Sequence, residues 1–278
     1  MAACSTRAQL AVVNVTALNF DGAIYQDEVF APELDLAADI YTPATDAPHD
    51  VVIFIYGGGW RTGEKAFYQF VGVTLAKEGF IAVIPDYRKY PDVRHPDFVD
   101  DAAKAVAWVH ANIEDFGGNP DRIYLSGHSA GAHIAGLLSA DERYLRDVGA
   151  DGVIKGFAGL AGPYHFNPEA PELVEIFGPP ERYPDMQVST FIDGSEPPMM
   201  LLHGLQDTIV GRINVDRLSK IMTGADACHA VRFYDDLGHD GIIAGFTWVF
   251  RGSRTVVDDV ANYFRAISAG ETCPAPSG

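Results

Sequence analysis

The chain has 278 residues, of which 47% are hydrophobic, so it can bury one large core. A single α/β domain spanning residues 1–278 is therefore expected rather than two small domains. The 38 acidic residues outnumber the 20 basic ones and give a formal net charge of -18, which repels nucleic acid and anionic lipid surfaces.

The sequence suggests neither a membrane span nor a metal or cofactor site. No apolar run approaches the ~20 residues that a membrane-spanning helix needs. The three cysteines, Cys4, Cys228 and Cys273, lack the short paired spacing of zinc and redox motifs. Small residues precede Cys4, as at the processing site of a bacterial lipoprotein, but the apolar part of a signal is missing. Two localisations stay open: an exported or lipid-anchored protein, in which Cys228 and Cys273 would be free to pair, and a cytoplasmic one.

Short apolar runs alternate with stretches of helical periodicity along the chain, a pattern typical of a mostly parallel sheet flanked by helices. Strands are predicted at 34–41, 51–56, 80–85, 122–126, 155–160, 199–203 and 230–234. Helices are predicted at 67–77, 97–113, 130–138, 214–222 and 256–267.

The segment from 163 to 198 differs from this pattern, with eight prolines and little periodicity. A segment of this length and composition inside a compact domain is uncommon unless it forms a lid or a binding wall. We therefore expect residues 163–198 to be a small lid-like or cap insertion. The ends, 1–10 and 270–278, are expected to be flexible.

The segment Gly127-His128-Ser129-Ala130-Gly131 lies between the strand predicted at 122–126 and the helix predicted at 130–138. A serine in such a sharp strand-to-helix turn is exposed to substrate, and only glycines at the flanking positions avoid clashes. Ser129 is therefore the candidate nucleophile.

Backbone N–H groups that could bind the oxyanion of a tetrahedral intermediate are available in two loops. The N–H of Ala130 follows the nucleophile at the start of a helix. The Gly57-Gly58-Gly59-Trp60 turn follows the buried strand at 51–56 and allows close backbone approach to a substrate.

Three segments, Gly57–Trp60, Asp86-Tyr87-Arg88 and Gly127–His133, resemble in order and composition the carboxylesterase-type α/β-hydrolases. The resemblance extends from about Leu34 to Phe264. It is closest to the feruloyl and acetylxylan esterase-like group, which is related to kynurenine formamidases and isoprenylcysteine methylesterases. It implies an α/β-hydrolase fold with Gly58 and Gly59 as oxyanion donors.

The chain departs from that family at Tyr56, where the family usually has histidine. We expect the Tyr56 phenol to pack under the Gly57–Gly59 loop and to donate a hydrogen bond to the backbone. This contact would replace the one made by the imidazole.

The fold places the acid after a late strand and the base after the last one. Asp207 follows the strand at 199–203, and His239 follows the strand at 230–234. Asp236 and Asp240 are rival acids, but neither has a strand that would carry it to the imidazole. The other nearby histidines are less suitable as the base: His128 and His133 are too close to Ser129 on one element, and His203 lies on the strand of the acid.

These residues predict a serine carboxylic ester hydrolase that acts on small acyl or aryl esters through a Ser129–His239–Asp207 triad and an acyl-enzyme, without a cofactor. Trp60, Tyr164 and the proline-rich segment are candidate walls of an apolar pocket. An amide hydrolase of the kynurenine formamidase type would use the same triad, so it stays an alternative. An inactive binding module is disfavoured because all three triad residues are present.

Overall fold

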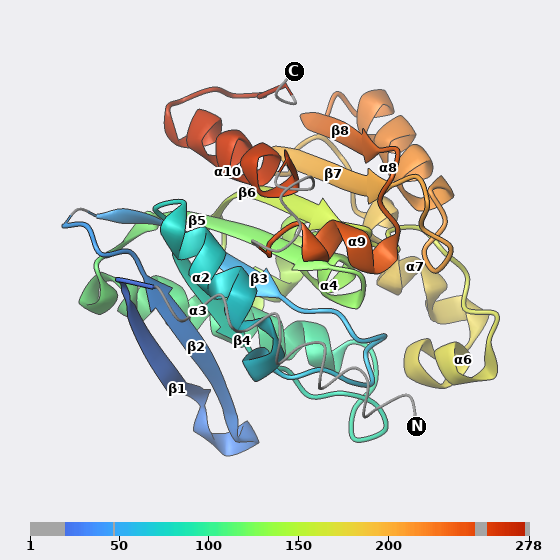
Figure 1. The fold of residues 1–278 in the computed structure, drawn as a ribbon. Coiled ribbons are helices and arrows are strands. Elements are labelled where there is room, and N and C mark those ends of the chain that lie inside the picture. The colour runs from blue at the N-terminus through green and yellow to red at the C-terminus, as the bar shows by residue number, and fades with distance from the viewer. Residues whose placement is uncertain (1–19, 47, 248–254, 276–278) are drawn as a thin grey trace.

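An eight-stranded sheet forms the centre of the structure, a computed structural model that describes residues 20–46, 48–247 and 255–275 (Figure 1). The strand order is β1-β2-β4-β3-β5-β6-β7-β8, with β1–β2 and β2–β4 antiparallel and the other neighbours parallel. The strands are β1 (Ala23–Ala31), β2 (Leu36–Thr42), β3 (His49–Ile55), β4 (Ile81–Pro85), β5 (Gly118–His128), β6 (Ile154–Leu160), β7 (Met199–Gly204) and β8 (His229–Tyr234).

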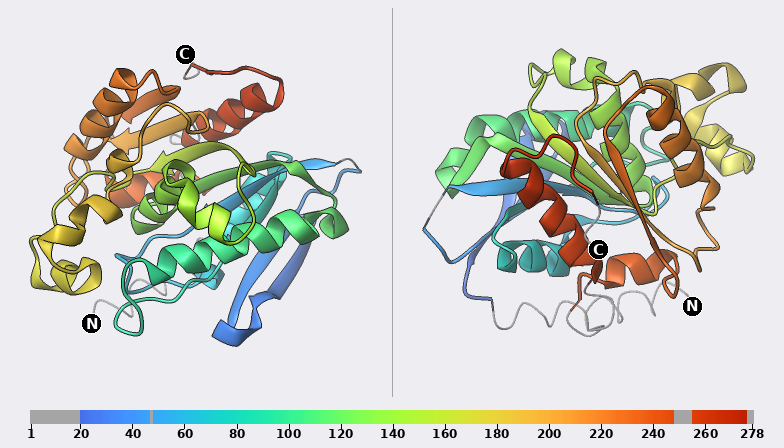
Figure 2. Two further views of the ribbon diagram at one scale, coloured as in Figure 1. Left: turned by 180° about the vertical axis from the view of Figure 1, so that it is seen from behind. Right: turned by 90° about the horizontal axis from the view of Figure 1, so that it is seen from above.

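Helices cover both faces of this sheet, which explains why the central strands are apolar along their whole length. In the right-hand view of Figure 2, α2 (Gln69–Lys77) and α10 (Thr255–Ser268) lie on one face. The opposite face carries α3 (Asp97–Asn112), α4 (Ala130–Ala140) and α8 (Ile213–Gly224). The shorter helices are α5 (Glu142–Asp147), α6 (Pro171–Phe177), α7 (Tyr183–Met186) and α9 (His239–Ala244). The 3-10 turns are η2 (Pro32–Leu34), η3 (Lys65–Tyr68), η4 (Ile113–Phe116), η5 (Pro180–Arg182) and η6 (Val188–Thr190). None of the helices in the described ranges has the length and apolarity needed to cross a bilayer.

The fold class predicted from the sequence is confirmed. The seven predicted strands correspond to β2–β8, and the five predicted helices correspond to α2, α3, α4, α8 and α10. Strand β1 was not predicted. It is a largely exposed edge strand whose pairing register shifts between Tyr25 and Glu28, and Asp27 has a φ of 58°, so no regular alternation marks it in the sequence.

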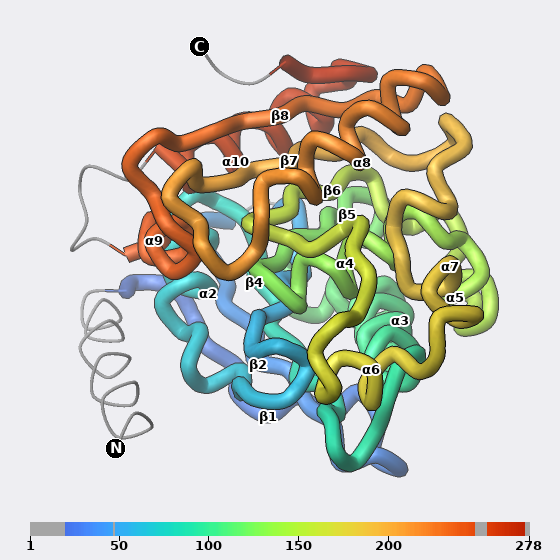
Figure 3. Tube along the Cα trace, turned by 90° about the vertical axis from the view of Figure 1, so that its right-hand side faces the viewer, coloured from blue at the N-terminus to red at the C-terminus, as the bar shows by residue number. Residues whose placement is uncertain are grey.

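The proline-rich segment 163–198 forms α6, η5, α7 and η6 beside the glycine loop. Figure 3 views the side of the molecule at which the parallel strands end, with α9 and α6 on opposite sides. The rings of Phe166 and Phe177 lie 5.8 and 4.8 Å from the ring of Trp60. The segment therefore supports the loop after β3 from the outside. Its role as a lid stays a prediction.

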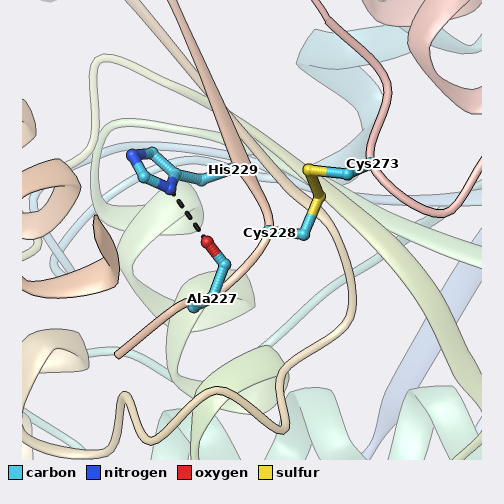
Figure 4. The surroundings of a disulfide bond; sticks show 4 residues. All are labelled: Ala227, Cys228, His229 and Cys273. Carbon is cyan, nitrogen blue, oxygen red and sulfur yellow. Dashed lines mark hydrogen bonds between the residues drawn. A yellow bond between two sulfur atoms is a disulfide. The ribbon is translucent and has the colours of Figure 1, made fainter. Parts of the chain in front are cut away.

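Cys228 and Cys273 form a disulfide bond, with their Cα atoms 5.5 Å apart (Figure 4). The bond joins the residue before β8 to the tail after α10, next to His229, whose Nδ1 lies 3.0 Å from the carbonyl oxygen of Ala227. The pairing expected for oxidising conditions is thus present. It ties down part of the tail at 270–278. Cys4 and residues 1–10 lie outside the described residues.

We expect the double variant Cys228→Ser/Cys273→Ser to lose stability. The two cysteines are 45 residues apart in sequence, and cross-linking a loop of that length stabilises a fold by ~4 kcal/mol through the entropy of the unfolded chain. Urea unfolding of the oxidised wild type and the variant measures the difference. Reductant should destabilise the wild type and leave the variant unchanged; equal unfolding midpoints for all samples would contradict the prediction.

Candidate active site

Ser129 occupies the turn between β5 and α4 with φ 54° and ψ -121°, a conformation that L-amino acids rarely adopt. Two backbone hydrogen bonds hold the turn: Ser129 N–H donates to the carbonyl of Leu160 (2.9 Å), and His133 N–H donates to the carbonyl of Ser129 (3.1 Å). The first of these ties the serine to the end of β6. The serine side chain thus stands at the carboxyl edge of the sheet.

The two glycines of the motif are required by the close approach of α4 to the sheet. A Cβ atom at Gly131 would lie 2.0 Å from the carbonyl oxygen of Ile55 at the end of β3. A Cβ atom at Gly127 would lie 2.6 Å from the backbone carbonyl of Gly131. Any larger residue at either position would push the helix away and shift Ser129.

The structure brings Ser129, His239 and Asp207 together in a chain of two hydrogen bonds. The Ser129 Oγ lies 2.9 Å from His239 Nε2, and His239 Nδ1 lies 2.8 Å from Asp207 Oδ2. His239 is the first residue of α9, the short helix that follows β8, and Asp207 lies in the turn after β7. The rival acids Asp236 and Asp240 are exposed. It is Asp207 that contacts the imidazole.

The environment of Asp207 keeps its carboxylate charged. Burial raises its pKa, but the hydrogen bond from His239 and those from the N–H groups of Val210 (2.9 Å) and Ile209 (2.8 Å) outweigh burial and lower it. Because Oδ1 accepts from the two backbone groups, Oδ2 is held toward the imidazole. The carboxylate therefore selects the tautomer in which Nδ1 carries the proton.

His128 is a site residue to which sequence reasoning assigned no role beyond excluding it as the base. Its Nε2 lies 3.0 Å from the backbone carbonyl of His239, and the two imidazole rings are 4.7 Å apart. Burial, followed by the nearby His239, lowers the pKa of His128 to about 3, so its ring is neutral at physiological pH. The Nε2–H then donates to the carbonyl and fixes the start of α9. Nothing in the sequence marks this contact except the position of His128 beside Ser129.

The glycine loop after β3 leaves its N–H groups available to a substrate. In the described part of the chain, the backbone N–H groups of Gly58, Gly59 and Ala130 donate no hydrogen bond to a turn or loop carbonyl. The loop is closed by Arg61 and Thr62, whose N–H groups donate to the carbonyl of Gly58. Gly58 has a φ of 134°, and a Cβ atom there would lie 2.1 Å from the carbonyl oxygen of Thr62, so the turn requires glycine.

Tyr56 supports this loop differently from the expectation. The prediction that its phenol donates to the backbone is wrong: the hydroxyl donates to Asp86 Oδ1 (2.6 Å) and accepts from Lys89 Nζ (2.9 Å). Asp86 follows β4, the strand paired in parallel with β3, so its carboxylate reaches the same edge of the sheet and is a stronger acceptor than a neutral carbonyl. The same Oδ1 accepts the N–H of Lys65 (2.9 Å), which begins η3.

The Tyr56 ring is also held from both sides. It stacks on Tyr68 (5.3 Å between ring centroids) and on Tyr87 (4.8 Å), and the Tyr87 hydroxyl donates to the carbonyl of Tyr56 (3.0 Å). In the Asp86-Tyr87-Arg88 segment, Arg88 binds Asp101 of α3 through Nε (2.9 Å to Oδ2) and Nη2 (2.7 Å to Oδ1). This segment thus anchors Tyr56, the residue that precedes the glycine loop.

A cavity of about 640 Å³ opens at Ser129. It is lined by Gly57, Gly58, Gly59, Thr62, Gly63, Glu64, Phe67, Tyr68, His128, Ser129, Ile209, His239 and Asp240. Trp60 and Tyr164, the expected pocket walls, are not among these residues. Trp60 is buried against Phe177, and Tyr164 is fully buried, with its ring nearly perpendicular to that of Phe157. Phe67, Tyr68 and Ile209 supply the apolar surface instead.

Metal-binding side chains do not gather at this cavity: in the described ranges, no three His, Cys, Asp or Glu side chains are placed to hold a metal ion. The arrangement offers a hydroxyl hydrogen-bonded to an imidazole, a carboxylate behind that imidazole, and backbone N–H groups nearby. Such a set suits nucleophilic attack on a carbonyl carbon followed by stabilisation of an oxyanion.

Comparison with known proteins identifies relatives that are named as esterases. Residues 38–156 match the family model BD-FAE. The isoprenylcysteine alpha-carbonyl methylesterase ICME of Arabidopsis thaliana is 36% identical over 194 residues, which are 61% of this chain and 45% of that protein. Esterase LipC of Mycobacterium tuberculosis is 30% identical over 198 residues, 63% of this chain and 49% of that protein. The chain thus spans less than half the length of these curated relatives.

Solved structures share the fold over nearly the whole chain. The truncated form of a carbohydrate esterase from gut microbiota superposes with a TM-score of 0.78 at 18% identity, covering 90% of this chain and 98% of that one. Esterase B from Lactobacillus rhamnosis gives a TM-score of 0.78 at 20% identity, covering 95% of both chains. The chain thus has the α/β-hydrolase fold. The BD-FAE match and the named relatives make it similar in sequence to carboxylesterase-type proteins, as its motifs predicted.

We expect Tyr56→Phe to destabilise the fold while reducing turnover only modestly. The change keeps the stacked ring but removes a buried hydrogen bond to a carboxylate, and hydrogen bonds to charged groups contribute about 1.5–3 kcal/mol. Urea unfolding and kcat on an activated ester measure the two effects.

Gly58→Ala serves as the comparison, because it forces a strained φ and displaces an N–H whose loss typically lowers turnover ~100-fold or more. A loss of turnover in Tyr56→Phe as large as in Gly58→Ala would mean that the hydroxyl contacts the oxyanion or the substrate.

Proposed function

We propose that this protein is a serine carboxylic ester hydrolase that acts on small acyl or aryl esters. The observation that carries the proposal is the continuous chain of short contacts from Ser129 Oγ through His239 to Asp207 at the cavity. The relatives named as esterases support ester hydrolysis as the reaction class.

In the first step, His239 Nε2 takes the proton of Ser129 as Oγ attacks the ester carbonyl. The Asp207 carboxylate stabilises the imidazolium that forms, and because its pKa is lowered it remains ionised throughout. The imidazolium then returns the proton to the alcohol, which leaves. Water, deprotonated by the same imidazole, hydrolyses the acyl-enzyme and regenerates Ser129.

The oxyanion formed in each step would lie among the N–H groups of Gly58, Gly59 and Ala130. The first two belong to the turn supported by Tyr56 and Asp86, and the third lies at the start of α4, where the helix dipole favours negative charge. Donors fixed before the reaction need no reorganisation, which makes this contribution usually the largest in acyl transfer.

We expect Ser129→Ala to reduce ester hydrolysis at least ~1,000-fold without unfolding the protein, because the variant lacks the nucleophile. The remaining oxyanion hole would account for any residual activity. The assay uses p-nitrophenyl esters of graded acyl length beside N-formylkynurenine, so that it also tests the formamidase alternative. Ser195→Ala, at an exposed position, is the matched control and should keep full activity. Turnover by Ser129→Ala near that of the wild type would remove this serine from the mechanism.

We expect Asp207→Asn to lose ~10,000-fold in kcat and Asp236→Asn to stay within a few-fold of the wild type. The amide introduced at position 207 would no longer select the productive tautomer of His239, whereas Asp236 is exposed. Steady-state kinetics on one activated ester compares the two, and the reverse ranking would reassign the role of the acid.

A further inference from the structure

Apart from two imidazoles and the Tyr68 phenol, the ionisable side chains among the described residues that line the active-site cavity are acidic. They are Glu64, at the start of η3, and Asp240, next to His239 in α9. Among the residues that the structure describes, no lysine or arginine lines the cavity. Both carboxylates are exposed, and within the described part of the chain neither forms a salt bridge with a lysine or arginine. Their charge therefore faces the opening of the cavity.

Two lysines near the glycine loop offset this charge only in part, because carboxylates outside the cavity lining also act on them. Lys65 Nζ is bound by Asp27 (2.6 Å) and Asp39 (2.7 Å). Lys89 Nζ donates to the Tyr56 hydroxyl and to the carbonyl of Tyr87 (2.6 Å), and it lies over the rings of both tyrosines. Although Lys89 is within the electrostatic reach of Glu64, the charge of Asp86 acts on the same ammonium group.

Aromatic rings line the cavity together with the carboxylates. Phe67 and Tyr68 follow Glu64 in η3, and burial, with a smaller contribution from the charge of Asp240, raises the pKa of Tyr68 to about 12. The phenol therefore stays protonated, and the negative charge of Asp240 acts on this part of the cavity. Tyr68 is stacked on Tyr56 and Phe70, whereas Phe67 has no stacked ring beside it in the described part of the chain. An aromatic face beside carboxylates attracts ammonium and guanidinium groups.

We propose that this cavity selects esters whose acyl or alcohol part carries a positive charge, with Glu64 and Asp240 as the residues that determine this specificity. The inference rests on the proposed ester hydrolysis. A cationic substrate would gain the field of both carboxylates and contact with the ring of Phe67. A carboxylate-bearing ester would be repelled. The net charge of -18 acts in the same direction at longer range and is screened beyond about 10 Å at 0.1 M salt.

The test uses two thioesters of equal shape, acetylthiocholine and its neutral carbon isostere S-(3,3-dimethylbutyl) thioacetate. We expect kcat/KM to favour the cationic thioester by about fivefold at low salt, from two screened carboxylates and an exposed cation–π contact. The preference should fall with ionic strength. In Glu64→Gln/Asp240→Asn the ratio should approach one.

The matched control is Asp151→Asn/Glu181→Gln, which makes the same change of charge at exposed positions outside the cavity lining and should keep the wild-type ratio. A wild-type ratio of one or less would overturn the proposal, as would an equal loss of preference in both double variants.

Binding to Ser129→Ala separates this proposal from the proposed function. Titration calorimetry compares choline with 3,3-dimethylbutan-1-ol, which differ in charge and not in shape. Tighter binding of choline supports the proposal even if the wild type does not hydrolyse either thioester. The lack of hydrolysis would then count only against the proposed function. Equal affinities would overturn the proposal whatever the turnover.

Discussion

The geometry of the site depends on how closely α4 approaches the carboxyl end of β3. The backbone of Gly131 passes against the carbonyl of Ile55, and this contact sets the position of the helix start and the strained conformation of Ser129. A residue in such a conformation persists only where its surroundings define it fully. Here the surroundings are the ends of three neighbouring parallel strands, because Ser129 follows β5, touches β3 through Gly131 and is hydrogen-bonded to β6 through Leu160.

Polar contacts position the other parts of the site at the same edge. The Asp86 carboxylate connects Tyr56 with the N–H of Lys65 and so links the two ends of the glycine loop. The Asp207 carboxylate connects the turn after β7 with His239, and the neutral His128 holds the backbone of His239. Each contact joins loops that follow different strands. The parallel sheet supplies a common edge, and the side chains define the distances across it.

The fold and the turn that carries Ser129 were largely predictable from the sequence because each rests on a local pattern. Continuous apolar runs mark β3 and β4, and the glycines around Ser129 mark a turn whose crowding requires them. The supporting contacts were not predictable. The partner of Tyr56 depends on the parallel pairing of β3 with β4, which places Asp86 within reach of the phenol. Trp60 is apolar and adjacent to the glycines, but it packs in the core against Phe166 and Phe177. These two residues come from a segment without periodicity, so their contact with Trp60 could not be predicted. Packing between residues far apart in the sequence cannot be inferred from the local spacing of residue types.

The disulfide bond has a consequence for how His239 is attached to the rest of the protein. His239 lies between Cys228 and Cys273 in sequence, so α9 and α10 belong to a covalent ring closed by the bond. A single break of the backbone anywhere inside this ring opens it without dividing the molecule into two pieces. The imidazole-bearing segment would then remain joined to the half that carries Ser129 and Asp207, and a protease that cuts once within the ring could not release it.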